Sequence, residues 1–187
     1  EEFFKKTFLG FSYIVPHSGD QVAQQRFYSS VFRNINIQGE RLLPQESRAS
    51  LYFLNEGLAE FFEPAFITNY KVKNQGLDTS ADFVRYMSLL SQLSKDGGSG
   101  RVARGYKLKM EKYYEDFIYS MVGDTPSSLF KPLIELFRDN NYAPQFAQLK
   151  QTFEGLELPV LFNSIIDMDT YFFGLIYKVV FERRDID

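Results

Sequence analysis

The sequence predicts a mainly α-helical fold, a multi-helix domain with at most one short strand near the N-terminus. Apolar residues recur at helical spacing in most segments, whereas the alternation typical of a strand occurs once. Hydrophobic residues make up 44% of the 187 residues, which is enough to bury one sizeable core. The chain has 20 Phe and 12 Tyr but no Trp, so we expect aromatic rings to fill much of that core.

Strand-like alternation is confined to residues 10–15. Phe11, Tyr13 and Val15 are separated by single residues, and Pro16 ends the run because proline cannot donate to a strand ladder. Helical periodicity governs the rest of the chain. Helices are predicted over residues 21–35, 44–62, 79–93, 102–122, 132–139 and 143–153, with a last helix around 172–180.

Capping residues and proline set the predicted helix boundaries. Thr79 is the expected N-cap of its helix, with Asp82 as its capping-box partner. Pro44 is expected at a first helical position, where its missing N–H would have no intrahelical partner. Asp167 and Asp169 are expected to cap the last helix rather than to bind a metal. Loops are predicted at residues 69–77 and 123–128, and a flexible hinge at 95–100. The glycine-rich residues 97–100 of this hinge lack the spacing of a phosphate-binding loop.

Composition excludes several classes of protein. The chain has no Cys, so neither a disulfide framework nor a thiolate metal site can form. The single His17 argues against a His-based metal site and against a catalytic triad. The formal net charge of −3 argues against a general polyanion-binding domain, although it is compatible with a local basic patch.

Targeting signals are not apparent either. Residues 1–9 lack the apolar run of a signal peptide, and polar residues interrupt the apolar stretch 160–181. We therefore expect a cytoplasmic protein without a membrane span. The sequence begins without Met and ends abruptly at Asp187, so we expect it to be a fragment of a longer chain.

A basic stretch runs from Lys95 to Lys112 and contains six basic residues but only two acidic ones. A solvated helix face has the same composition, so this alternative stays open beside a nucleic-acid contact. Arg101, Arg104 and Lys107 are spaced three apart and can share one helix face. These three are the candidate nucleic-acid-binding residues, with DNA as the expected partner.

One segment carries more information than its periodicity. It follows the pattern F-x-x-I-N-x-x-G-x-x-L-x-x-x-E-x-R, which begins at Phe32 and ends at Arg48. Asn36 can end a helix by bonding to the backbone, and Gly39 can take the positive φ that closes a last turn. Glu46 can bond the free N–H at the start of the next helix, which is a purely structural explanation for it. Arg48 can pair with a carboxylate or a phosphate through its planar guanidinium.

This segment, with the run L-G-F-S-Y-I-V at residues 9–15, closely resembles the domain family DUF 262, the GmrS-like half of the GmrSD modification-dependent restriction enzymes. The family pattern is F-x-x-I-N-x-x-G-x-x-L-[ST]-x-x-E, and this chain departs from it at Leu43. The resemblance covers residues 1–64 and is weaker beyond, where it rests on helices such as 171–175. We therefore expect a single helical domain over residues 1–187, with a motif-bearing part (1–64) and a helical extension (65–187).

The resemblance implies a ParB-type nuclease or nucleotide-hydrolysing domain followed by helices, often with an HNH-type nuclease domain in the same or a partner chain. The chemistry of such proteins is attributed to an upstream D-G-Q-Q-R motif. Residues 24–26, Gln-Gln-Arg, do not match it, because Asp-Gly is missing before them and Leu-Thr after them. The chain therefore resembles the helical, downstream part, in which we expect no catalytic residue, cofactor or metal ligand. A nucleotide and a divalent metal are expected only in the parent protein.

Two hypotheses of function follow. In the first, the chain is the helical portion of a GmrS-like restriction or phage-defence protein, and Asn36, Gly39, Glu46 and Arg48 complete or brace a nucleotide or nucleic-acid site. In the second, it is a non-catalytic structural module that docks partner domains through an aromatic face. A D-G-Q-Q-R motif upstream in the gene, or an HNH pattern downstream, would favour the first.

Overall fold

The structure is a computed structural model that describes the chain in part. The described residues are 13, 15, 17, 19–20, 23–24, 27–28, 30–31, 44–52, 54–73, 76, 78–97, 103 and 107–186, with the backbone alone for 44–47 and 107–108. The chain forms two compact units, Glu1–Glu40 and Arg41–Asp187.

Few residues of the first unit are described. Those at positions 23, 24, 27, 28, 30 and 31 are helical, in agreement with the predicted helix over 21–35. Tyr13 and Val15 lie outside any strand, and the other residues of the predicted strand lie outside the described part. The fold is therefore argued from the second unit.

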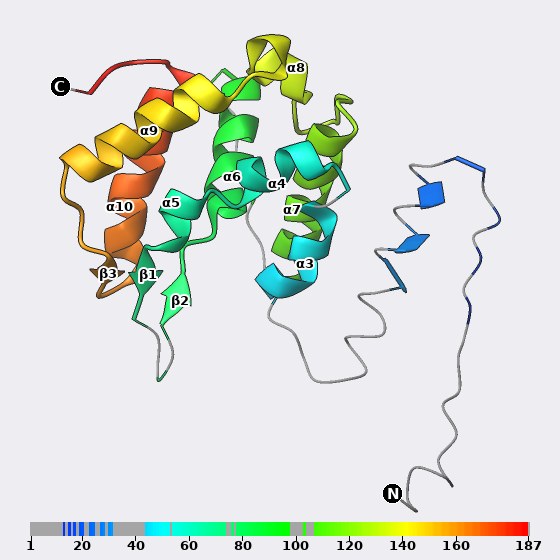
Figure 1. Cartoon of the computed structure of the whole chain (residues 1–187), viewed down its shortest axis with the longest axis horizontal. Helices are drawn as coiled ribbons and strands as arrows, with labels where there is room; N and C mark the ends of the chain where they lie inside the picture. The colour runs from blue at the N-terminus through cyan, green and yellow to red at the C-terminus, as the bar shows by residue number, and fades with distance from the viewer. Residues whose placement is uncertain are drawn as a thin grey trace, which may run out of the picture. The chain divides into compact units, whose positions relative to one another are not determined.

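The second unit is mainly helical, as predicted (Figure 1). In chain order its elements are α3 (Pro44–Tyr52), the 3₁₀ turn η1 (Glu56–Leu58), α4 (Ala59–Phe62), α5 (Ala65–Thr68), β1 (Lys71–Val72), β2 (Thr79–Ser80), α6 (Phe83–Lys95), α7 (Lys107–Val122), α8 (Leu133–Leu136), the 3₁₀ turn η2 (Arg138–Asn140), α9 (Ala143–Gly155), β3 (Leu161–Phe162), α10 (Ile165–Ile176) and the π-helical turn η3 (Tyr177–Phe181). Among the helices of the described segments, none combines the length and the apolar character needed to cross a bilayer.

A small sheet, which the sequence did not predict, lies at one end of this unit. Its strand order is β2-β1-β3, with β1 antiparallel to β2 and parallel to β3. The backbone N–H groups of Lys71 and Lys73 donate to the carbonyls of Val160 and Phe162 at 2.8 and 2.9 Å. Strands of two residues are too short to show alternation, so residues 69–77 had the pattern of a loop.

Two predicted helix starts are wrong. Thr79 lies in β2, and Asp82 is the N-cap of α6, where its side chain accepts from the N–H of Arg85 at 3.3 Å. The helix predicted from residue 102 begins at Lys107. Before it, the N–H of Ala103 donates to the side chain of Gln92 at 3.1 Å instead of entering a helical ladder.

Other predicted boundaries are closer to the structure. Pro44 opens α3, as expected for a residue that lacks an N–H. The predicted helix over 44–62 is interrupted, because Asn55 caps η1 by accepting from the N–H of Gly57 at 3.2 Å. The last helix begins at Ile165, earlier than its apolar period indicated.

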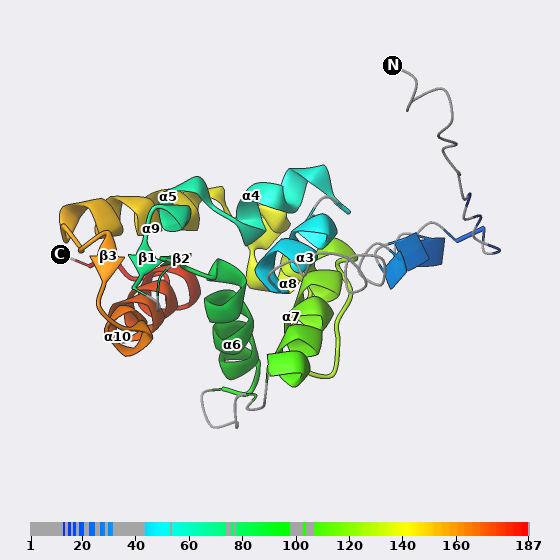
Figure 2. The same cartoon turned by 90° about the horizontal axis from the view of Figure 1, so that it is seen from below.

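Aromatic rings fill the core, in agreement with the composition. Phe61 and Phe172 are both fully buried, and each is the centre of a group of rings. Around Phe61, ring centroids lie at 5.0 to 5.8 Å from those of Phe62, Phe137, Tyr142 and Phe146. The two groups meet along α6, which packs against α7 on one side and α10 on the other (Figure 2).

Buried tyrosines make the stability of this core dependent on pH at the alkaline end. Burial is the largest cause that raises the pKa of Tyr52, Tyr86, Tyr113 and Tyr114, to about 12 for Tyr114. An unfolded tyrosine has a pKa of about 10. The folded chain therefore keeps protons that the unfolded chain loses above that pH. This contribution is fully present below the unfolded pKa and is lost as pH rises above it.

We expect the urea midpoint of unfolding to fall steeply above a pH of about 10. Tyrosinate absorbance should rise together with unfolding, because the buried rings ionise only when they reach water. Tyr52→Phe removes one of the ionising groups and should flatten the dependence. A midpoint that stays constant well above that pH would contradict the expectation.

Candidate functional site

Arg48, the last residue of the motif, lies in the interior of the second unit with 1% of its side chain exposed. From α3, its Nη2 donates to Oδ2 of Asp82 at 2.5 Å and its Nη1 to Oδ1 at 3.4 Å. Its Nε lies 2.7 Å from Oε2 of Glu111 on α7. The guanidinium also lies over the ring of Tyr114, 4.8 Å from its centroid. One side chain therefore joins α3, α7 and the start of α6.

The charge of Arg48 is stabilised by its partners. Burial alone would lower its pKa, but attraction and hydrogen bonding to Asp82, with smaller effects from Tyr52 and Glu111, raise the pKa above its ordinary value. Asp82 and Glu111 are themselves only 17% and 21% exposed, so water screens these pairs weakly. A planar guanidinium can contact both carboxylates at once, which an ammonium group cannot do in the same geometry.

A second cluster of charged side chains, partly buried, joins α6 to α10. Arg85 donates to both carboxylate oxygens of Asp169, from Nη1 at 2.6 Å and from Nη2 at 2.5 Å, and the hydroxyl of Tyr86 donates to Oδ1 at 2.6 Å. The guanidinium also lies over the rings of Tyr86 and Phe173, at 5.0 and 5.3 Å from their centroids. Burial would lower the pKa of Arg85, but the bonds to Asp169 raise it.

The expectation that Asp169 caps the last helix is wrong. Ser164 is the N-cap of α10, and its hydroxyl oxygen accepts from the N–H of Asp167 at 3.1 Å. Asp167 lies in the first turn, where a negative charge is favourable. Asp169 lies beyond that turn, so its carboxylate is directed across to α6.

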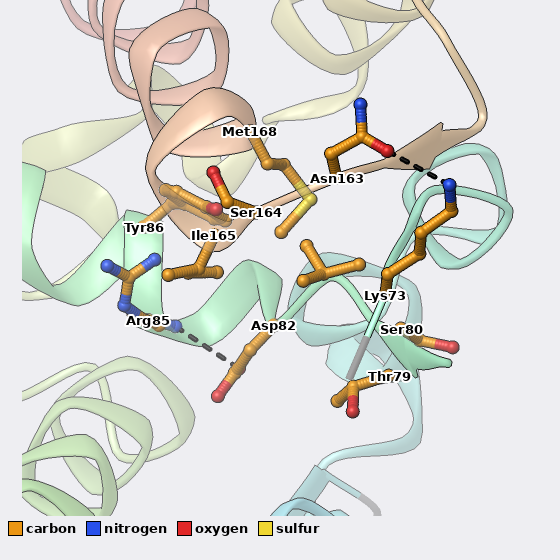
Figure 3. Close-up of a pocket in the computed structure, with 11 residues that line it drawn as sticks. Lys73, Thr79, Ser80, Asp82, Arg85, Tyr86, Asn163, Ser164, Ile165 and Met168 are labelled. Carbon is orange, nitrogen blue, oxygen red and sulfur yellow. Dashed lines mark hydrogen bonds between the residues drawn. The ribbon is translucent and has the colours of Figure 1, made fainter. Parts of the chain in front are cut away.

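A cavity of about 570 Å³ lies between these helices and the small sheet. Both N-cap residues, Asp82 and Ser164, are on its wall. Figure 3 shows Lys73 and Asn163 together on one side of the cavity and Asp82 with Arg85 on the other. The full lining is Val72, Lys73, Thr79, Ser80, Asp82, Arg85, Tyr86, Asn163, Ser164, Ile165 and Met168.

The lining of this cavity combines polar groups with an apolar floor formed by Val72, Ile165 and Met168. Lys73 donates from Nζ to Oδ1 of Asn163 at 2.9 Å, which links β1 to the turn before α10. Met168 is buried, and Ile165 is 46% exposed. A cavity of this size, with an apolar floor and a few convergent polar groups, has the form of a small-molecule site.

The other residues predicted for a site are placed only in part. Asn36, Gly39, Arg101 and Arg104 lie outside the described residues. Glu46 lies on α3 and Lys107 opens α7, with their side chains outside the described part. Of the four motif residues, Arg48 is therefore the one whose contacts the structure gives.

Part of the basic stretch is described on α7. Lys109 and Lys112 are exposed, and they line a second cavity of about 300 Å³ together with Gln92, Tyr113 and Asp116. Among the described residues, no group of three His, Cys, Asp or Glu side chains could hold a metal ion.

Sequence reasoning missed most of the residues that line the larger cavity. Asp82 drew notice only as the capping-box partner of Thr79. Arg85 is the one charged residue in the apolar run 83–87, which was a usable signal. Lys73 and Asn163 are 90 positions apart and give no local signal. Comparison of the chain with protein-family models, with curated proteins and with solved structures found no match.

Proposed function

We propose that this chain is the helical portion of a GmrS-like restriction or defence protein, and that it braces a nucleotide or nucleic-acid site whose catalytic motif belongs to another part of the parent protein. The observation that carries the proposal is the position of Arg48. A motif residue that contacts a ligand directly would lie at the protein surface or in the wall of a cavity. Arg48 is instead buried and holds two carboxylates from two other helices.

The bracing role extends from the motif to the cavity through one residue. Asp82 accepts from Arg48, caps α6 and lies on the cavity wall. Arg48 therefore fixes the start of α6, and with it the position of Arg85 one turn later. This chain of contacts supports a role in which the motif arginine orients a site without touching the ligand.

DNA is the proposed partner, and the basic stretch is the proposed contact. Lys109 and Lys112 extend it along α7, three residues apart on one helix face and both exposed. The other candidate DNA contacts lie earlier in the same basic stretch and are Arg101, Arg104 and Lys107. An HNH-type nuclease domain, in the same or another chain, would supply a second catalytic centre.

The alternative, docking through an aromatic face, has less support. Most rings of the second unit lie in the core, as Phe61 and Phe172 illustrate. The exposed apolar side chains around β3 and the start of α10 are mainly aliphatic, with Val160 at 64% and Ile166 at 73% exposure. Most of the rings that this hypothesis needs at the surface are therefore buried in the core.

The proposal is tested by nucleotide-dependent DNA cleavage and thermal melting of the full-length protein that contains this chain. Arg48→Lys keeps the charge but loses the planar fork, so we expect Tm and cleavage to fall together. Sucrose, which favours compact states, should restore both. Arg138→Lys is the matched control, because the Arg138 side chain is 91% exposed.

The outcomes separate the parts of the proposal. Loss of cleavage at an unchanged Tm would place Arg48 in contact with the ligand and contradict bracing. A lower Tm with full cleavage under assay conditions would make Arg48 a stability residue alone. Absence of nucleotide-dependent cleavage by the unsubstituted full-length protein would contradict membership of a GmrS-like system.

A further inference from the structure

We propose that the cavity between α6, α10 and the small sheet binds an organic phosphate, with the phosphate at Lys73 and the attached ring or apolar body on the floor formed by Val72, Ile165 and Met168. This is the cavity that Arg48 braces in the proposed function, but the inference is carried by the side chains that line the cavity and not by the motif. It assigns a ligand-binding role to residues outside the motif.

The first argument is the charge of Lys73. Arg85 is paired with Asp169, and Asp82 is paired with Arg48, which also contacts Glu111. Lys73 has a different kind of partner, because the group it bonds in the described structure is the neutral amide of Asn163. An ammonium group that lies at a cavity beside a neutral partner attracts an anion, and its two other N–H groups can donate to it.

The second argument is the set of hydrogen-bond donors on the lining. On the Lys73 side, the amide of Asn163 presents an NH₂ group once its oxygen has accepted from Lys73. The hydroxyls of Thr79, Ser80 and Ser164 are further donors on the lining. Each of these groups can donate to a bound anion. A phosphate, with three terminal oxygens, can accept from more of them than a carboxylate can.

The third argument is the apolar floor. Figure 3 shows Met168 between the Lys73–Asn163 pair and Asp82 with Arg85, and Ile165 beside it. Met168 can adapt to an irregular or flat partner, and Ile165 would lose water on contact. The volume of about 570 Å³ falls within the range of small-molecule sites and exceeds what a lone phosphate would occupy. The body of the ligand is therefore expected to contribute to binding.

The experiment is calorimetric titration of the whole chain with adenosine monophosphate, adenosine and inorganic phosphate as probes. We expect the monophosphate to bind more tightly than either of the others, because it engages both the ammonium group and the floor. Phenyl phosphate should likewise bind more tightly than benzoate, which tests phosphate against carboxylate on the same ring.

Two lysines of the small sheet give a matched pair of variants. Lys73→Gln should weaken binding of the monophosphate by about tenfold, since a hydrogen bond from a charged group is lost. Lys71→Gln should leave binding unchanged, because Lys71 is an exposed residue of β1 that is not on the lining. Both side chains are exposed, so both variants should fold, and circular dichroism checks this.

Several results would overturn the assignment. They are equal binding of adenosine and its monophosphate, tighter binding of benzoate than of phenyl phosphate, equal weakening by the two lysine variants, and no binding of any phosphate probe. Ser80→Ala adds an independent check. Its small effect should fall on the phosphate probes and leave adenosine unchanged.

Discussion

Arg48→Ala is expected to lower the free energy of unfolding by roughly 3–5 kcal/mol, the range for breaking a buried ion pair by removing one partner. Asp82 and Glu111, which are only 17% and 21% exposed, would lose the cation between them. The packing of the guanidinium on Tyr114 would also be lost. Domains are commonly stable by about 5–15 kcal/mol, so the variant could lose a large share of its stability.

Urea unfolding, followed by far-UV circular dichroism, measures this loss. Arg138→Ala is the control, because its pair with Asp139 is almost fully exposed and its side-chain nitrogen is 3.8 Å from the carboxylate. We expect it to change stability by less than about 0.5 kcal/mol. Equal effects of the two substitutions would show that the pairs around Arg48 contribute no more than surface pairs do.

A triple substitution separates the lost attraction from the stranded charges. Arg48→Met with Asp82→Asn and Glu111→Gln removes all three charges and keeps their approximate volumes. It should be less destabilising than Arg48→Ala alone, because no uncompensated carboxylate stays near the interior. A triple variant that is less stable than the single one would show that Arg48 contributes attraction beyond its cost of burial.

The mainly helical fold was predictable because amphipathic periodicity is a local property. α9 and α6 each have an apolar face long enough to be recognised, and the abundance of Phe and Tyr indicated an aromatic core. The sheet was not predictable in this way, because Lys71 and Val72 pair with Leu161 and Phe162 across 90 positions of sequence. Contacts at such separation leave no local period.

The cap of α6 shows how a correct residue can receive the wrong role. Thr79 and Asp82 have the spacing of a capping box, so the pattern placed the helix start three residues too early. The structure gives Thr79 to β2 because β1 supplies a pairing partner that the local pattern cannot include. Asp82 then serves as the cap itself and is positioned to accept from Arg48.

Of the residues at the candidate site, the sequence singled out one for its binding chemistry. The motif singled out Arg48 as a side chain able to pair with a carboxylate or a phosphate, and in the structure its partners are carboxylates. Local chemistry could not decide between these partners, because both suit a planar guanidinium. The cavity residues come from the small sheet, α6, α10 and the segments next to them, so their meeting depends on tertiary packing.

Phe172→Ala is expected to cost roughly 3–5 kcal/mol of unfolding free energy, since it removes a whole ring from a close-packed site. Phe172 is fully buried on α10. Its ring centroid lies within 4.8 to 5.9 Å of those of four neighbours, Tyr70, Tyr86, Phe153 and Phe162. These residues come from α6, α9, β3 and the segment before β1. Filling the space left by the removed ring would therefore require several elements to move at once.

Two further variants make the measurement specific. Phe172→Leu keeps much of the volume and should cost roughly 1–2 kcal/mol. Tyr171→Ala removes the neighbouring ring on the same helix, which is 47% exposed, and should cost clearly less than Phe172→Ala. If Tyr171→Ala and Phe172→Ala shift the urea midpoint equally at unchanged m-value, helix propensity would explain both effects, and the group of rings around Phe172 would not be the centre of stability that its packing indicates.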